Sequence, residues 1–156
     1  MLEQFYNKET NTLILPYYFN DKLSDLPNSI TNLTFGPCFN QSVGHQGCNI
    51  SCSRNLPNSI THLTFGYYFD QSIDKLPKNI KELGFASGNK IKNNIPENIE
   101  NIEIVFLNNE NDSMIENIPC HIKQIKINER HRINYLKKIP FGCKVVDEEE
   151  KEIFLE

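Results

Sequence analysis

The feature of this sequence that most limits its fold is a motif of 17 residues that occurs twice. Residues 26–42 read LPNSITNLTFGPCFNQS, and residues 56–72 read LPNSITHLTFGYYFDQS. Copies also start at the Leu-Pro or Ile-Pro pairs of residues 76, 95, 118 and 139, and residues 10–25 match the second half of a copy. The six starts at 26, 56, 76, 95, 118 and 139 are separated by 30, 20, 19, 23 and 21 residues. A period of this length is typical of a solenoid, in which each copy stacks on its neighbours.

The apolar positions within one copy predict a short strand and an extended return. Counted from the Leu of the Leu-Pro pair, they are positions 1, 5, 8, 10, 14 and 18, and positions 8 and 10 alternate like one face of a strand. The remaining residues, roughly fifteen, barely admit a crossover helix. We therefore expect a mainly β solenoid of about six short coils with one parallel sheet and irregular or 3₁₀ return segments. Position 10 forms an apolar ladder of Leu15, Phe35, Phe65, Phe85, Ile104 and Ile127.

Proline and glycine mark the corners of each coil. Proline at position 2 fixes φ and marks the first corner. Gly36 and Gly66 stand at position 11, where a turn out of the strand favours positive φ. Pro16 takes this place in the first coil.

A single domain is expected over residues 1–156, with an N-terminal cap at 1–9, repeats at 10–140 and a C-terminal cap or tail at 141–156. Solenoids need caps over their terminal apolar coils. We expect Val146 to occupy position 8 of the last coil. The residues expected to cover the two ends are Leu2, Phe5 and Tyr6 at the first coil, and Ile153, Phe154 and Leu155 at the last.

The pattern Leu-Pro-x-x-Ile-x-x-Leu-x-Phe-Gly-x-x-Phe resembles the FNIP repeat, a relative of the leucine-rich repeat. The resemblance is strongest over residues 26–75, extends to 10–25 and 76–140, and is absent at 1–9 and 141–156. It implies a leucine-rich-repeat-like fold and a source among social amoebae or the giant DNA viruses of amoebae. Many viral members resemble F-box proteins at their N-terminus, but the roughly ten residues before the first coil here are too few for an F-box. The Asn ladder that leucine-rich repeats carry at position 13 is also missing, since that position reads Tyr18, Cys38, Tyr68, Gly88, Leu107 and Arg130.

The outward strand positions are the first candidate for function. Positions 7 and 9 present rigid rows of side chains, from which we expect the binding residues Asn32, Thr34, His62, Thr64, Glu82, Asn101, Glu103, Gln124 and Lys126. We find no nucleophile paired with a base, no phosphate-binding loop and no metal signature. The sequence therefore favours a non-enzymatic protein–protein interaction scaffold without a cofactor. A substrate-recognition subunit of a ubiquitin ligase that lacks its own F-box is an alternative implied by the resemblance.

A ten-residue insertion, Gly44–Ser53, is the second candidate. It carries His45, Cys48 and Cys52, which with Cys38 would supply the four ligands of a tetrahedral Zn²⁺ site. The spacing matches no familiar zinc pattern, so free thiols and a disulfide remain alternatives. A metal-dependent factor built on this insertion is thus a further alternative function.

Four tyrosines and a charged region complete the candidates. Tyr17, Tyr18, Tyr67 and Tyr68 are expected to wall a turn, and an interface is the alternative. Six basic residues within 123–138 precede the run DEEEKE at 147–152, so we expect the two to neutralise one another.

Composition limits the partners. The net charge of −4 does not favour nucleic acid, and no apolar run reaches the length of a membrane span. Five irregularly spaced cysteines favour a reducing compartment. We expect a cytoplasmic protein, in the host cytoplasm if it is viral, whose protein partner is unknown and could include host ubiquitin-ligase components. It would be a monomer or an end-to-end dimer.

Overall fold

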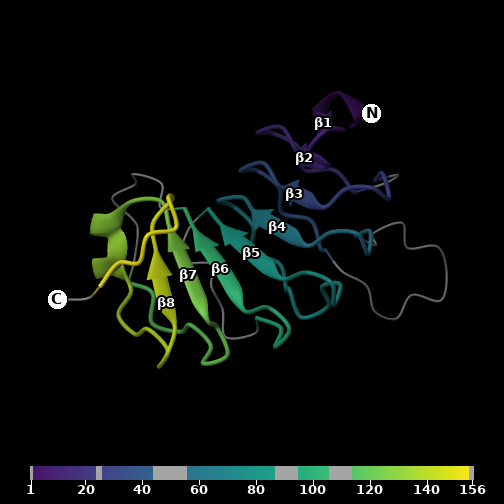
Figure 1. The fold of residues 1–156 in the computed structure, drawn as a ribbon. Helices are drawn as coiled ribbons and strands as arrows, with labels where there is room; N and C mark the ends of the chain where they lie inside the picture. The colour runs from purple at the N-terminus through teal and green to yellow at the C-terminus, as the bar shows by residue number, and fades with distance from the viewer. Residues whose placement is uncertain (1, 24–25, 44–55, 87–94, 106–113, 155–156) are drawn as a thin grey trace.

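The chain forms one sheet whose strands follow the order of the sequence (Figure 1). The computed structural model describes residues 2–23, 26–43, 56–86, 95–105 and 114–154. β1 is antiparallel to β2, and every later pair is parallel. The strands are β1 (Tyr6–Asn7), β2 (Thr12–Ile14), β3 (Asn32–Thr34), β4 (His62–Phe65), β5 (Glu82–Phe85), β6 (Asn101–Ile104), β7 (Gln124–Ile127) and β8 (Lys144–Val146), with 3₁₀ helices η1 (Glu3–Phe5) and η3 (Arg130–Tyr135).

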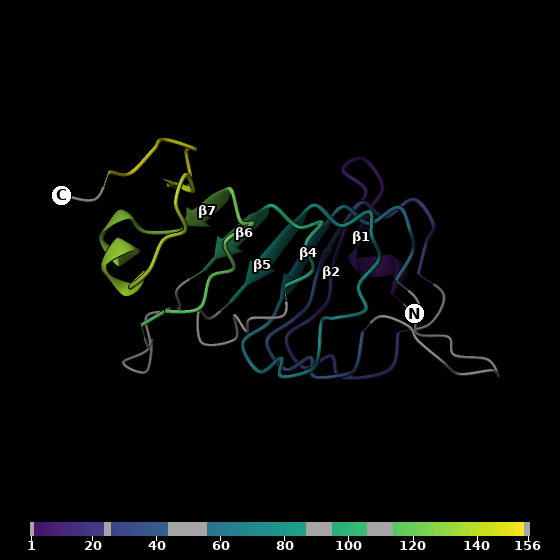
Figure 2. The ribbon, with the colours of Figure 1, turned by 90° about the horizontal axis from the view of Figure 1, so that it is seen from below.

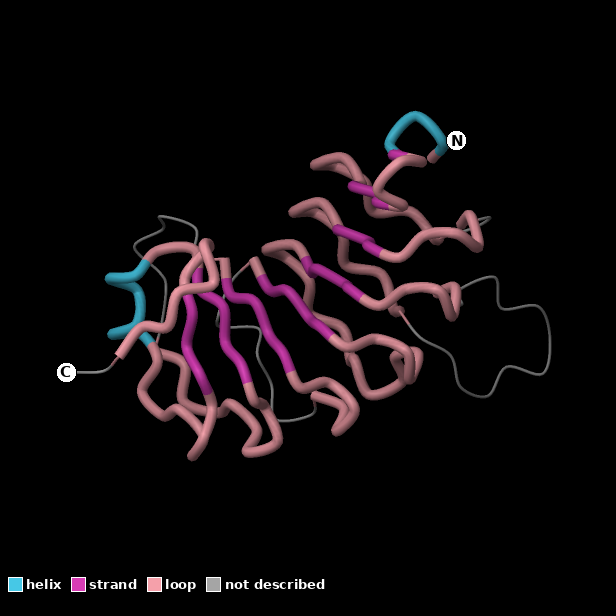
Figure 3. Tube along the Cα trace, in the orientation of Figure 1, coloured by secondary structure: helices cyan, strands magenta, loops and turns pink. Residues whose placement is uncertain are grey.

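Equivalent positions of successive coils stack directly on one another. Leu33 lies opposite Leu63, and Leu63 lies opposite Leu83. Figure 2 shows the coils as a row of flattened loops, and Figure 3 shows that loops and turns make up nearly all of the described return path. The predicted solenoid with a parallel sheet and 3₁₀ or irregular returns is confirmed. No helix among the described residues is both long and apolar enough to cross a membrane.

Tight turns form the corners of the coils. A turn at a proline precedes each strand from β3 to β8, and in the first three coils a second turn at Pro16, Gly36 or Gly66 follows the strand. At the first corner, the carbonyl of Pro27 accepts the N–H of Ile30 at 3.2 Å, and the same bond recurs at the prolines of the later coils. At the second corner, the carbonyl of Gly66 accepts the N–H of Phe69 at 3.2 Å. Pro16 serves the first coil in the same way, with its carbonyl 3.0 Å from the N–H of Phe19.

The glycines of the second corner are required for a different reason from the one predicted. Among the described glycines, only Gly142 has a positive φ, at 76°. A Cβ at Gly36 would lie 2.2 Å from the carbonyl oxygen of Pro16, and one at Gly66 would lie 2.1 Å from that of Gly36. The prediction of positive φ is therefore wrong. Glycine is needed because the corners stack backbone on backbone.

The core is a ladder of aliphatic side chains that turns aromatic in the middle coils. Every residue of the predicted position-10 ladder is at most 2% exposed, which confirms it. The rings of Phe35 and Phe65 stack at a centroid distance of 5.7 Å, and those of Phe39 and Phe69 at 6.4 Å. Phe35 and Phe65 also stack on the Phe of position 14 in their own coils, Phe39 at 4.0 Å and Phe69 at 4.1 Å. No coil buries these rings alone, so the stack is the unit that folds.

The N-terminal cap is confirmed, because Leu2, Phe5 and Tyr6 pack against the core. Leu2 directly precedes η1, Phe5 ends it, and Tyr6 begins β1, which pairs with β2.

The C-terminal end differs from the prediction in two ways. β8 lies within residues 141–156, and Val145, not Val146, pairs with Ile125. The Pro140–Cys143 turn closes like its equivalents, with the Cys143 N–H donating to the Pro140 carbonyl at 3.0 Å. β8 nevertheless begins at Lys144, one residue sooner after its proline than the other strands do. Gly142 at φ 76° suits the third place of a type II turn.

The chain after β8 folds back as expected, but not with all three predicted residues. Ile153 packs against the core, and its N–H donates to the carbonyl of Val145 at 2.8 Å. Phe154 is 77% exposed, so its predicted place in the cap is wrong. Leu155 lies outside the described residues.

Candidate functional site

The structure brings all nine predicted binding residues onto one face of the sheet, which we call the outer face. Its two rows alternate with the buried ladder along each strand. The first row runs through Asn32, His62, Glu82, Asn101 and Gln124, and the second through Thr34, Thr64, Gly84, Glu103 and Lys126. Neighbouring members of a row lie one strand apart, roughly 4.8 Å. The outer face is thus a regular grid of polar groups.

The half of the outer face formed by β2 to β4 is neutral. The amide of Asn32 donates to Thr12 Oγ1 at 3.4 Å, and the hydroxyl of Thr61 lies 2.8 Å from Nδ1 of His62. At the middle of the grid, a Cβ on Gly84 would lie 2.6 Å from the side-chain oxygen of Thr64. The threonine therefore occupies the space that a side chain on β5 would need.

The half formed by β5 to β7 is charged. Glu82 lies 3.9 Å from Nε2 of His62. Burial raises the pKa of the Glu103 carboxyl, Lys126 opposes this rise, and the carboxylates of Glu82 and Glu148 add to it. Lys126 therefore compensates the charge of the Glu103 carboxylate only in part.

The acidic segment after β8 lies beside this charged half. Lys126 Nζ is 3.9 Å from Glu150, and Arg130 Nε is 3.6 Å from Asp147. Asp147 also accepts the N–H groups of Glu149 and Lys151 through one carboxylate oxygen, at 3.0 and 2.9 Å. The expected neutralisation of basic residues by the acidic run is confirmed for these two. Lys123 and Lys137 instead pair with Glu100 and Glu116, each at 2.5 Å.

A side-chain ladder replaces the missing asparagines of position 13. It stands two residues later, at position 15. Asn20 Oδ1 accepts the N–H of Asn40 at 2.8 Å and the amide of Gln41 at 3.2 Å. Asn40 Oδ1 likewise accepts from Asp70 N–H at 2.9 Å and Gln71 at 3.1 Å. The sequence signal that could have revealed it is the Asn or Asp that directly follows Phe19, Phe39 and Phe69.

The four tyrosines and the residues between them form the tyrosine corner, defined as Tyr17, Tyr18, Pro37, Cys38, Tyr67 and Tyr68. Tyr17 and Tyr18 meet edge to face at a centroid distance of 4.7 Å, and Tyr67 and Tyr68 do so at 5.0 Å. Tyr17, Tyr18 and Tyr68 are 54%, 83% and 55% exposed. The tyrosines do line a turn, as predicted, but three of them are mostly exposed, and only Tyr67 is half-buried.

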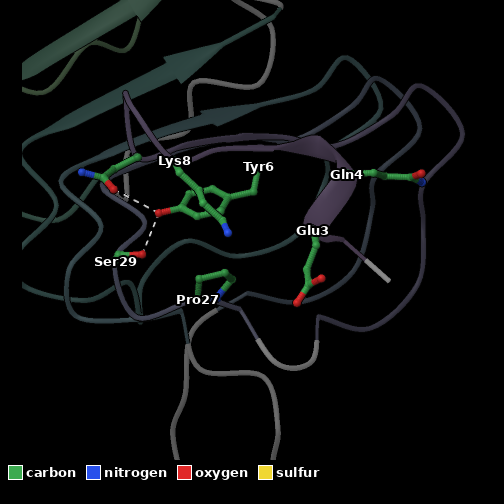
Figure 4. Close-up of a pocket in the computed structure, with 7 residues that line it drawn as sticks. Glu3, Gln4, Tyr6, Lys8, Pro27 and Ser29 are labelled. Atoms are coloured by element: carbon green, nitrogen blue, oxygen red, sulfur yellow. Dashed lines mark hydrogen bonds between the residues drawn. The ribbon is translucent and has the colours of Figure 1, made fainter.

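A hollow of about 740 Å³ lies under the N-terminal cap (Figure 4). Its lining residues are Glu3, Gln4, Tyr6, Lys8, Asn11, Pro27 and Ser29. Figure 4 shows the Tyr6 hydroxyl between two partners: it donates to Asn11 Oδ1 at 3.0 Å and lies 2.6 Å from Ser29 Oγ. These bonds tie the cap to the first coils. The charged residues of the lining are Glu3 and Lys8, and both are exposed.

The predicted zinc ligands fall mostly outside the described residues. His45, Cys48 and Cys52 lie there, and Cys38 is a half-buried free thiol. Within the described ranges, no group of three or more His, Cys, Asp and Glu side chains could hold a metal ion. The zinc hypothesis thus remains a prediction. Of the other described thiols, Cys143 has its pKa raised to about 11 by burial.

These short strands, paired tight turns and in-register apolar ladders define a leucine-rich-repeat-like solenoid. The family model of the FNIP repeat matches residues 53–88, which confirms the predicted resemblance to FNIP-repeat proteins, and the fold is leucine-rich-repeat-like. Among solved structures, the chain is similar to one described as "The crystal structure of CroV588 a novel circular LRR protein structure", with 25% identity and a TM-score of 0.53. The match covers 87% of this chain and 20% of that chain, so this chain spans about one fifth of it. No curated protein matches the sequence significantly.

Proposed function

We propose that the protein is a non-enzymatic scaffold that binds another protein through its outer face. One observation carries the proposal: nine polar side chains lie in two rows on strands that pair in register. Side chains held by a sheet lose little further freedom on binding, so more of their interaction energy appears as affinity. Repeat proteins generally use such extended surfaces for recognition.

The two halves of the outer face indicate what a partner must offer. Asn32, Thr34 and Thr64 offer the partner neutral hydrogen-bonding groups, whereas Glu82 and Glu103 favour a basic group of the partner opposite them. Charge complementarity of this kind fixes the orientation of a partner more than it raises affinity. In our proposal the encounter takes place in the cytoplasm, in that of the host if the protein is viral.

Affinity capture with matched arginine variants tests the proposal. Asn101→Arg places a bulky cation in the middle of the outer face. Asn28→Arg makes the same change at an exposed turn position away from the sheet. We expect Asn101→Arg to reduce the recovered partner at least about tenfold, and Asn28→Arg to leave it unchanged. Both variants should melt like the wild type.

Equal recovery of the partner by both variants would show that binding occurs elsewhere on the molecule. The identity of the partner separates the proposal from the ligase alternative. Recovery of ubiquitin-ligase subunits together with a substrate would identify a recognition subunit that lacks its own F-box, whereas other proteins alone would indicate the plain scaffold.

A further inference from the structure

The tyrosine corner has a fixed backbone geometry. The N–H of Cys38 donates to the carbonyl of Tyr17 at 3.1 Å, and the N–H of Tyr68 donates to the carbonyl of Pro37 at 2.9 Å. Successive coils are thus hydrogen-bonded through the turn itself. As a result, each tyrosine pair stands on a rigid base, and the smaller Pro37–Cys38 pair separates the two.

The spacing of the two tyrosine pairs matches a known helical repeat. They stand two coils apart, which at the spacing of neighbouring strands is roughly 9.6 Å. A polyproline II helix has three residues per turn and rises about 3.1 Å per residue, so its side chains return to one face every 9.3 Å or so. A proline-rich segment lying along the solenoid axis can therefore place residues i and i+3 on the two pairs.

The chemistry of the corner suits the same occupant. Proline rings pack well on aromatic faces, and aromatic-lined surfaces are a common way to bind proline-rich segments. A polyproline II backbone makes no internal hydrogen bonds, so its carbonyls need donors. Within the described part of the chain, the hydroxyls of the four corner tyrosines make no hydrogen bond that would prevent them from donating.

The border of the corner adds charge to this pattern. The ladder of Asn20, Asn40 and Asp70 runs beside it, and Asp21 is exposed there. The exposed carboxylate of Asp21 can meet a basic residue at one end of the bound segment, as at the polar rim of other interfaces.

We propose that the tyrosine corner binds a proline-rich segment of a partner protein in the polyproline II conformation, with prolines three residues apart seated on the Tyr17–Tyr18 and Tyr67–Tyr68 pairs. The corner is a surface separate from the outer face. The two sites can be tested independently, and failure of one leaves the other intact.

Titration with synthetic peptides, followed by the amide NMR signals of Tyr18, Cys38 and Tyr68, tests this proposal. The first probe is an arginine followed by about ten prolines, and its control replaces the prolines by alternating glycine and serine. Two further peptides carry proline at every third residue and at every fourth residue, respectively, with serine elsewhere. We expect saturable shifts below about 1 mM for the polyproline and every-third peptides, and at least about tenfold weaker binding of the other two.

Two protein variants locate the site. Tyr18→Ala and Tyr68→Ala remove exposed rings and should fold normally, as their melting temperature checks. Each should weaken polyproline binding at least about tenfold. Phe141→Ala, which removes a fully exposed ring near the other end of the solenoid, should leave it within about twofold. The proposal is overturned if no peptide binds, if the glycine–serine control binds equally well, or if the tyrosine variants bind like the wild type.

Discussion

At the scale of single residues, glycine is needed at Gly36 and Gly66 for a different reason than at Gly142. At Gly36 and Gly66 the carbonyl of the coil before lies where a Cβ would be. At Gly142 a Cβ would meet nothing within 4 Å, and the residue is instead needed for its positive φ of 76°. Gly36 and Gly66 are needed because a side chain has no space there, whereas Gly142 is needed for its backbone conformation. The two kinds of site should therefore respond differently to substitution.

Substitution by alanine and by asparagine should separate the two roles. Gly66→Ala has to push two coils apart, and we expect it to lower the free energy of unfolding by about 3 kcal/mol or more. Gly142→Ala should cost about 1–2 kcal/mol, the usual penalty of the left-handed region. Asparagine tolerates that region, so Gly142→Asn should recover part of the loss, whereas Gly66→Asn should be at least as damaging as alanine. Urea unfolding measures all four, and a similar recovery by asparagine at both sites would contradict the distinction.

Glu103 makes the stability of the folded chain depend on pH. Its pKa is raised above the ordinary 4.5, mainly by burial, so the folded chain holds this proton more tightly than the unfolded chain does. Its contribution to stability is therefore largest at low pH and is lost as pH rises from 4.5 through the raised pKa. Glu103→Gln should be more stable than the wild type at neutral pH, and the difference should shrink toward pH 4.5.

Glu116→Gln is the control for this pH dependence. The hydrogen bond from Lys137 lowers the pKa of Glu116, so this substitution should not stabilise the protein at neutral pH. Urea midpoints of the three proteins at the two pH values give the comparison. A Glu103→Gln variant that is less stable than the wild type at neutral pH would show that its carboxylate is well compensated.

At the scale of elements, the strands are short, and a tight turn precedes each of β3 to β8. The described parallel strands have three or four residues, and nearly everything else in a coil is turn or extended return. The sequence predicted this arrangement well, since the alternation of positions 8 and 10 and the Pro and Gly punctuation are local signals. It did not predict the register of β8, because Val145 and Val146 are both apolar and β8 begins one residue sooner after its proline than the other strands do.

The last element is the segment that folds back on β8, and one of its side chains should stabilise it. Ile153 packs on the core, while its neighbour Phe154 is mostly exposed. We expect Ile153→Ala to lower the free energy of unfolding by about 1–2 kcal/mol, since the side chain is partly buried. Phe154→Ala should change it by less than about 0.5 kcal/mol although a larger group is removed. Thermal or urea unfolding of the two variants checks this, and a larger loss at Phe154 would reverse the assignment.

At the scale of the whole molecule, the sequence predicted the scaffold better than the surfaces on it. Positions 7 and 9 were correctly expected on one face, because strand periodicity settles which side chains share a face. The sequence indicated that the basic and acidic regions would pair. It did not indicate that Lys126 would contact Glu150, because that contact depends on how the chain turns after β8. The spacing between the tyrosine pairs likewise emerges only when residues 50 apart in sequence, such as Tyr17 and Tyr67, stack two coils apart.

Both edges of the described sheet end in an antiparallel contact, β1 on β2 at one side and the Val146–Glu152 bridge at the other. A further parallel coil could pair with β2 or β8 only by displacing these contacts. A coil inserted in the interior of the sheet would instead find parallel neighbours on both sides. The near identity of residues 26–42 and 56–72 is what a recent duplication of one such interior coil would leave in the gene.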